Sequence, residues 1–227
     1  MVFSTPVFLF GYLPIVLFVY FLAPRSFKNL ILLLASLFFY AWGEVFYVGV
    51  MVASILSNYI IGKLIFSSHG NNNGNQAPKI YLFLGVAVNL LLLFSFKYMN
   101  FFMVNLNEAL HIFNIPIFEF EAIHLPLGIS FFTFQAISYI VDVYKKEVKA
   151  QENILNLALY ISLFPQLIAG PIIRYHDVAQ QIIDRFHSIE LFSSGVQRFI
   201  IGLAKKMIIA NTVGQVADNV FALDAAD

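Results

Sequence analysis

The sequence predicts an all-α, polytopic membrane protein, and three observations lead to this fold class. Of the 227 residues, 60% are hydrophobic and only 11% are charged, less than half of the roughly 25% found in ordinary soluble domains. Several stretches carry no charged side chain, and each approaches the roughly 20 residues that a helix needs to cross the hydrocarbon core. Lys and Arg number 13, as do Asp and Glu. The chain therefore has no net positive charge with which to hold nucleic acid.

Five charge-free stretches are expected to cross the membrane completely. They are residues 1–24, 29–43, 45–62, 80–96 and 122–141. The first is expected to be retained, because a cleaved signal peptide has basic residues before its apolar region, whereas here Arg25 and Lys28 follow it. Residues 67–78, rich in Asn and Gly, are expected to form a flexible cytoplasmic loop. Residues 100–121 are expected to form an interfacial segment on the external side.

The connections between these stretches alternate between basic and acidic. The basic connections follow the first, third and fifth stretches and contain Arg25, Lys28, Lys63, Lys79, Lys145, Lys146 and Lys149. The other two contain Glu44, Glu108, Glu119 and Glu121, apart from Lys97, whose long side chain can reach the interface. Loops rich in Lys and Arg stay in the cytoplasm, so the N-terminus is expected to lie outside.

A sixth charge-free stretch, Asn153–Ile173, does not fit this alternation. If it crossed completely, the basic residues that follow it would lie outside. Pro165 and the Gly170-Pro171 pair interrupt it, because proline lacks a backbone N–H and disfavours helix in the residue before it. We expect a broken, re-entrant segment that returns to the cytoplasmic side and lines a substrate funnel. Residues 193–223 have apolar residues at helical spacing and are expected to form an amphipathic cytoplasmic surface helix or a helix packed against the funnel.

The chemical motifs of many soluble enzymes are missing. The sequence has no phosphate-binding glycine loop, no His-Glu-x-x-His and no Gly-x-Ser-x-Gly. The absence of cysteine excludes disulfides and a cysteine nucleophile. The five histidines are never three or four residues apart, so no helical metal site is predicted.

Two stretches carry the candidate binding residues. In residues 125–144, an otherwise apolar span carries the polar side chains Ser130, Thr133, Gln135, Ser138 and Asp142, which should face a neighbouring helix or a cavity. Ser130, Gln135 and Asp142 are the candidates for binding. In residues 163–178, Gln166 lies in the broken segment, and Arg174 and Tyr175 follow it. The guanidinium of Arg174 could bind a phosphate or a carboxylate. Helix–helix hydrogen bonds for the first stretch, and a proline kink beside an interfacial arginine for the second, remain open alternatives.

Both stretches also resemble a known family. Together with Met1-Val2-Phe3-Ser4 and Gly202-Leu203-Ala204-Lys205-Lys206, they are similar to the membrane-bound O-acyltransferases, in particular their bacterial alginate O-acetylation branch. The resemblance implies a multi-span enzyme of the bacterial inner membrane that takes an acetyl group from cytoplasmic acetyl-CoA and moves it toward an extracytoplasmic polysaccharide. It also implies a separate periplasmic acetyltransferase partner and no bound cofactor or metal.

The chain departs from this family at its hallmark, a histidine in a Trp-His-Gly context. The single tryptophan, Trp42, is followed by Gly43, so no catalytic residue is expected within this chain. Residues 1–227 are therefore expected to be the N-terminal part of a single acyltransferase domain, inactive by itself, without its catalytic half. A transporter of a lipid-linked or acyl substrate and a non-catalytic membrane scaffold remain alternative interpretations, and the acceptor polysaccharide is left open.

Overall fold

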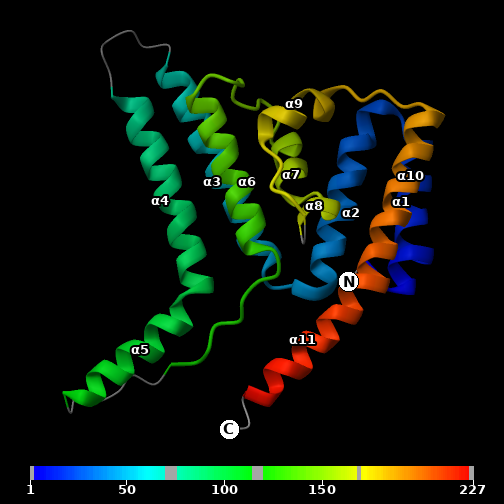
Figure 1. Ribbon diagram of the computed structural model, residues 1–227. Helices are drawn as coiled ribbons and strands as arrows, with labels where there is room; N and C mark the ends of the chain where they lie inside the picture. Colours follow the sequence, from blue (N-terminus) through cyan, green and yellow to red (C-terminus); the bar gives the residue numbers. More distant parts are fainter. Residues whose placement is uncertain (1–2, 70–75, 114–119, 168–169, 225–227) are drawn as a thin grey trace. The chain divides into compact units, whose positions relative to one another are not determined.

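The computed structural model describes residues 3–69, 76–113, 120–167 and 170–224, and every regular element among them is a helix (Figure 1). This confirms the all-α prediction for the described part. By their contacts, these residues form two units: residues 16–183, and residues 2–15 together with 184–227. Whether the chain is a part of one domain stays a prediction.

The first unit contains most of the helices. They are α1 (Leu13–Leu22, which begins in the second unit), α2 (Lys28–Glu44), α3 (Val48–Ser68), α4 (Ala77–Lys97), α5 (Met99–Ile112), α6 (Ile129–Tyr144), α7 (Ile154–Ser162), α8 (Phe164–Leu167) and α9 (Tyr175–Ile183). The second unit contains a π-helix over Val7–Tyr12 and a long helix made of α10 (Ile189–Ala204), a π-helical turn (Lys205–Ala210) and α11 (Asn211–Asp224).

Three predicted spans are confirmed as helices long and apolar enough to cross a membrane. They are Arg25–Glu44, Val48–Ser68 and Ala77–Lys97. The first and fifth predicted spans form shorter apolar helices, Val7–Leu22 and Ile129–Tyr144. The helix predicted at residues 193–223 is present within Ile189–Ala222. It also meets the length and composition of a membrane span, whereas the sequence analysis expected a cytoplasmic surface helix or a helix packed against the funnel. The count of five spans therefore stays a prediction.

The start of the fifth predicted span requires a correction. It was expected at residue 122, but helix α6 begins at Ile129. Residues 120–126 have no helical structure, because Pro126 and the left-handed Gly128, with φ +73°, end the connection in a turn. The loop predicted at residues 67–78 and the interfacial segment at 100–121 lie partly outside the described residues; within them, residues 99–112 are helical.

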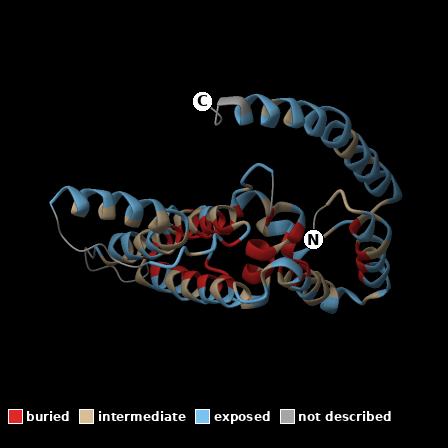
Figure 2. Ribbon diagram, turned by 90° about the horizontal axis from the view of Figure 1, so that it is seen from below, coloured by how far each residue is buried: buried red, intermediate tan, exposed pale blue. Residues whose placement is uncertain are grey.

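Helices α3, α4 and α6 pack against one another in the core of the first unit. Glycines permit the close approach: a Cβ on Gly62 would lie 2.6 Å from the ring of Tyr139, and one on Gly85 would lie 2.8 Å from Ile140. Asn58 and Asn89, both buried, exchange side-chain hydrogen bonds of 3.1 and 2.7 Å between α3 and α4. Figure 2 shows the buried residues along this unit, whereas α10 has none.

The break predicted within residues 153–173 is present: α7 ends at Ser162, and the chain turns back on itself after it. Asn153 caps α7 by accepting a hydrogen bond from the N–H of Leu155 at 2.9 Å. The carbonyl oxygen of Leu167 lies 2.6 Å from the position of a Cβ on Gly128, before the start of α6. Arg174 contacts Asp142, near the end of α6. The segment therefore runs along α6 and back (Figure 1); whether this path is re-entrant in a membrane stays a prediction.

Candidate functional site

An ion pair joins two of the predicted site residues. Nη2 of Arg174 lies 2.5 Å from Oδ1 of Asp142 and 2.5 Å from Oε2 of Glu147. The side chain of Asp142 is 1% exposed, whereas that of Arg174 is 45% and that of Glu147 36% exposed. A buried carboxylate needs a partner to compensate for lost hydration. Arg174 provides it, and part of the Arg174 side chain still faces solvent.

Helix α6 also holds the beginning of α9 through two side chains one turn apart. Ser138 Oγ accepts a hydrogen bond from the N–H of Tyr175 at 3.3 Å, and Asp142 Oδ2 accepts one from the N–H of His176 at 3.1 Å. These N–H groups lie in the first turn of α9, where no carbonyl of the same helix can accept them. A carboxylate is also favoured at a helix N-terminus by the helix dipole. Ser138 and Asp142, two of the polar residues of α6, therefore serve to hold α9 in place.

Three tyrosines and Gln151 hold the residues next to Arg174 in the chain, Ile173 and Tyr175, in place. The ring of Tyr175 lies edge-on to those of Tyr139 and Tyr160, with centroids 5.0 Å apart in both pairs. Gln151 donates from Nε2 to the hydroxyl of Tyr175 at 2.7 Å and from its backbone N–H to the hydroxyl of Tyr139 at 3.0 Å. Tyr160 donates to the carbonyl of Ile173 at 2.7 Å. The chain on both sides of Arg174 is thereby fixed.

These surroundings shift the pKa of two groups at the site. The hydrogen bond to Asp142, together with the charge of that carboxylate, raises the pKa of Arg174 above its ordinary value. Burial raises the pKa of the Tyr175 hydroxyl, and the hydrogen bond from Gln151 offsets part of this rise. Arg174 is therefore a permanent cation, and Tyr175 is neutral at physiological pH.

The structure brings only some of the six predicted site residues together. Asp142, Arg174 and Tyr175 meet in the network just described. Gln166 donates to the carbonyl of Tyr160 at 2.6 Å and thus stabilises the turn between α7 and α8. Ser130 is half-buried in the first turn of α6. Gln135 is 1% exposed, and its Oε1 has no hydrogen-bond partner among the described residues.

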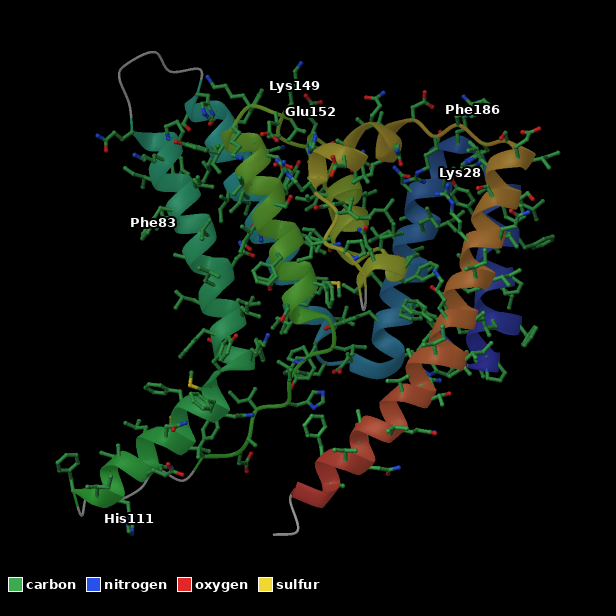
Figure 3. All side chains as sticks on the ribbon, viewed as in Figure 1. Lys28, Phe83, His111, Lys149, Glu152 and Phe186 are labelled. Atoms are coloured by element: carbon green, nitrogen blue, oxygen red, sulfur yellow. The ribbon has the colours of Figure 1, made fainter. Side chains whose placement is uncertain are left out.

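Sequence reasoning missed Glu147 and Gln151. Both lie in the polar connection between α6 and α7, where a charged or amide side chain is ordinary and gives no signal. Figure 3 shows Lys149 and Glu152, from the same connection, at the end of the first unit where Lys28 also lies, and His111 at the opposite end. Which of the two ends faces the cytoplasm stays a prediction.

A metal site at this network is disfavoured by charge. Ligand atoms of Asp142, Glu147 and His176 all lie within 4.8 Å of one another, a grouping that the spacing of the histidines did not reveal. However, the guanidinium of Arg174 already contacts both carboxylates, and a cation there would have to displace it.

Acid–base catalysis by histidine has little support within the described residues. His69 is half-buried, and His111, His124, His176 and His187 are exposed. A catalytic histidine in a water-excluded site would be buried and held by a partner. The arrangement can instead bind an anion: Arg174, whose side chain is 45% exposed, is fixed in place by a buried carboxylate at the end of a broken segment.

Comparisons with known proteins support the resemblance drawn from the sequence. The chain is 41% identical over 223 residues, 98% of its length, to a probable alginate O-acetylase AlgI of Azotobacter vinelandii, and 42% identical to the AlgI protein of Pseudomonas aeruginosa over the same share. It is 35% identical over 260 aligned positions to a peptidoglycan O-acetyltransferase of Helicobacter pylori. No family model and no solved structure matches the chain.

The matches cover only part of each relative. The chain spans 44% of the Azotobacter protein, 42% of the Pseudomonas protein and 47% of the Helicobacter protein, so it spans about half the length of the curated relatives. The similarity to the alginate O-acetylation proteins, predicted from the sequence strings, is confirmed.

Proposed function

Because this chain is a relative of alginate O-acetylases over nearly its whole length, we propose that it forms part of a membrane O-acetyltransferase. The protein takes an acetyl group from a cytoplasmic donor, acetyl-CoA, and passes it across the inner membrane for O-acetylation of an exopolysaccharide such as alginate. The observation that carries this proposal is the 41% identity over 98% of the chain. The apolar helices and the broken segment beside α6 support it.

The acetyl group is the part of the reaction that the names of the relatives have in common. The names of the relatives share acetyl transfer to an oxygen but differ in the polymer, alginate or peptidoglycan. We therefore assign to this chain a role on the donor side, and propose alginate as acceptor on the greater identity to the alginate proteins. A separate periplasmic acetyltransferase would complete delivery to the sugar.

Arg174 is the residue proposed to bind the donor. It follows the returning segment, next to the connection that carries Lys145, Lys146 and Lys149, on the side predicted to be cytoplasmic. Its side chain is 45% exposed while Asp142 fixes it in place. A fixed guanidinium loses little freedom when it binds a second anion, so it is suited to a phosphate of acetyl-CoA.

The test uses the full-length protein that carries this sequence, purified into nanodiscs with its polysaccharide acceptor. Arg174→Ala should raise the KM for acetyl-CoA about 10- to 150-fold, the range of one charge-assisted hydrogen bond, with a smaller change in kcat. Lys149→Ala is the matched control, because it removes a positive charge from the neighbouring connection between α6 and α7 and should change the KM less than threefold. Equal effects of the two variants, with normal folding, would reject the role of Arg174. Absence of donor-dependent acetylation by the wild type would reject the function itself.

A further inference from the structure

The two carboxylates that contact Arg174 are held in different ways. Asp142 is buried and also accepts the N–H of His176 at 3.1 Å. Glu147 is 36% exposed, and Arg174 is the one partner of its side chain among the described hydrogen bonds and ion pairs. Removing the Asp142 carboxylate would break a buried ion pair and leave the N–H of His176 without its acceptor. Removing Glu147 would return a half-exposed carboxylate to water.

The backbone after α6 places Glu147 at the arginine. Lys146 has φ 61°, a left-handed conformation rare for residues other than glycine and asparagine. The N–H of Glu147 then donates to the carbonyl of Asp142 at 3.0 Å, which closes the end of the helix. This turn directs the chain back toward Asp142. The Glu147 carboxylate consequently reaches the same Nη2 atom that Asp142 contacts.

Charge favours exchange of Glu147 over exchange of Asp142. Two carboxylates share one guanidinium, so the group as a whole carries one uncompensated negative charge. The ligand atoms of Asp142 and Glu147 lie within 4.8 Å of each other, and like charges at that distance repel. Water screens Glu147, which is exposed, so its pair with Arg174 contributes little. A stronger anion can therefore take its place while Asp142 stays bound.

We propose that Glu147 occupies the anion site of Arg174 in the absence of substrate and is displaced by a phosphate group of the acetyl donor. This inference rests on the proposed function and concerns the regulation of the same site. The incoming phosphate replaces the carboxylate on Arg174, Glu147 turns into solvent, and no covalent bond changes. A phosphate is preferred over Glu147 because it offers several acceptor oxygens to the planar guanidinium.

If Glu147 competes with the donor for Arg174, removing the Glu147 carboxylate should strengthen binding of the donor. Glu147→Gln removes the competing charge and should lower the Kd for coenzyme A about 1.5- to 5-fold, the value of an exposed ion pair. Asp142→Asn should weaken binding, because Arg174 then loses its buried anchor. Binding is measured by calorimetry on the full-length protein in phosphatidylcholine nanodiscs, with coenzyme A as a probe that carries no acetyl group.

Glu152→Gln is the matched control for Glu147→Gln. It removes the same charge from the same connection, five residues away, and Glu152 takes part in the described contacts only through its backbone carbonyl, which accepts from Tyr59. Tighter binding by Glu147→Gln but not by Glu152→Gln supports displacement. Equal effects of the two changes, or weaker binding by Glu147→Gln at unchanged thermal stability, would overturn it.

Three further outcomes separate this inference from the function on which it rests and from binding of a lipid headgroup. If the wild type and Glu147→Gln bind coenzyme A equally while acetyl transfer is intact, the displacement is wrong and the proposed function stands. If neither binds coenzyme A, both the donor and the displacement are wrong. If anionic phosphatidylglycerol in the nanodisc abolishes the difference between Glu147→Gln and the wild type, the phosphate comes from a lipid headgroup and the assignment to the donor is overturned.

Discussion

Gly62 on α3 faces the ring of Tyr139 on α6 so closely that a Cβ at residue 62 would lie 2.6 Å from the ring. Tyr139 is fully buried, and its hydroxyl accepts the N–H of Gln151. The ring therefore cannot move aside without loosening the connection that leads to α7. This contact sets the spacing of the two helices.

Gly62→Ala is expected to destabilise the protein by about 1–3 kcal/mol, the usual cost of overpacking a filled core. Gly49→Ala on the same helix is the control, because a Cβ there meets no atom within 4 Å, and alanine is the better helix former. Unfolding in detergent, followed by circular dichroism, measures both. Equal stability of the two variants would show that α3 and α6 are further apart than described.

The paired carboxamides of Asn58 and Asn89 should be coupled. Replacing either by leucine leaves the other buried without its cross-helix partner, at a cost of about 1–2 kcal/mol. The double variant should cost less than the sum of the single variants, because it leaves no unpaired amide. A double-mutant cycle on unfolding free energies measures the coupling. Strict additivity would show that the two amides do not bond across the helices.

Stability should fall at alkaline pH because of Tyr175. Burial raises the pKa of its hydroxyl, so the folded protein holds that proton more tightly than the unfolded chain, whose value is about 10. The resulting stabilisation is complete below pH 10 and is lost as pH rises from there toward the higher folded pKa. Tyr175→Phe should lose less stability between pH 9 and 11 than the wild type, whereas Tyr98→Phe, at an exposed tyrosine, should follow the wild type. Identical profiles for all three proteins would contradict this.

The predicted orientation can be tested with single cysteines, since the chain contains none. Cysteines in place of Asn72 and Lys146 should react only after the membrane is permeabilised, whereas one in place of Glu108 should react with an impermeant reagent in intact cells. This follows from the retention of basic loops in the cytoplasm. Labelling of residue 72 or 146 from outside would reverse the assignment.

The 227-residue chain by itself is expected to be unable to transfer acetyl groups. Attack on a thioester needs a positioned base or nucleophile, and none of the five histidines is buried. The assay mixes the purified chain with radiolabelled acetyl-CoA and polysaccharide, with the full-length protein as positive control. Donor-dependent acetylation above the level without protein would place the catalytic centre within these residues.

The fold class and several boundaries could be predicted from local sequence alone. Charge-free runs indicated helices because lipid requires every backbone polar group to be bonded within the segment. Pro165 and Gly170-Pro171 indicated the break after α7, because proline lacks a backbone N–H and disfavours helix in the residue before it. The start of α6 was placed seven residues too early, because apolar residues before Pro126 look identical in composition to the helix that follows.

Asp142 and Arg174 were recognised separately, each as a polar residue at the edge of an apolar stretch, but their pairing was not. They are 32 residues apart, and only the return of the chain along α6 brings them together. Glu147 and Gln151 gave no signal, because polar residues are ordinary in a polar loop. Their side-chain partners, Arg174 for Glu147 and the hydroxyl of Tyr175 for Gln151, are identified only in the folded structure. Hydrophobicity acts residue by residue and can be read along the sequence, whereas the site depends on distances between segments that only packing determines.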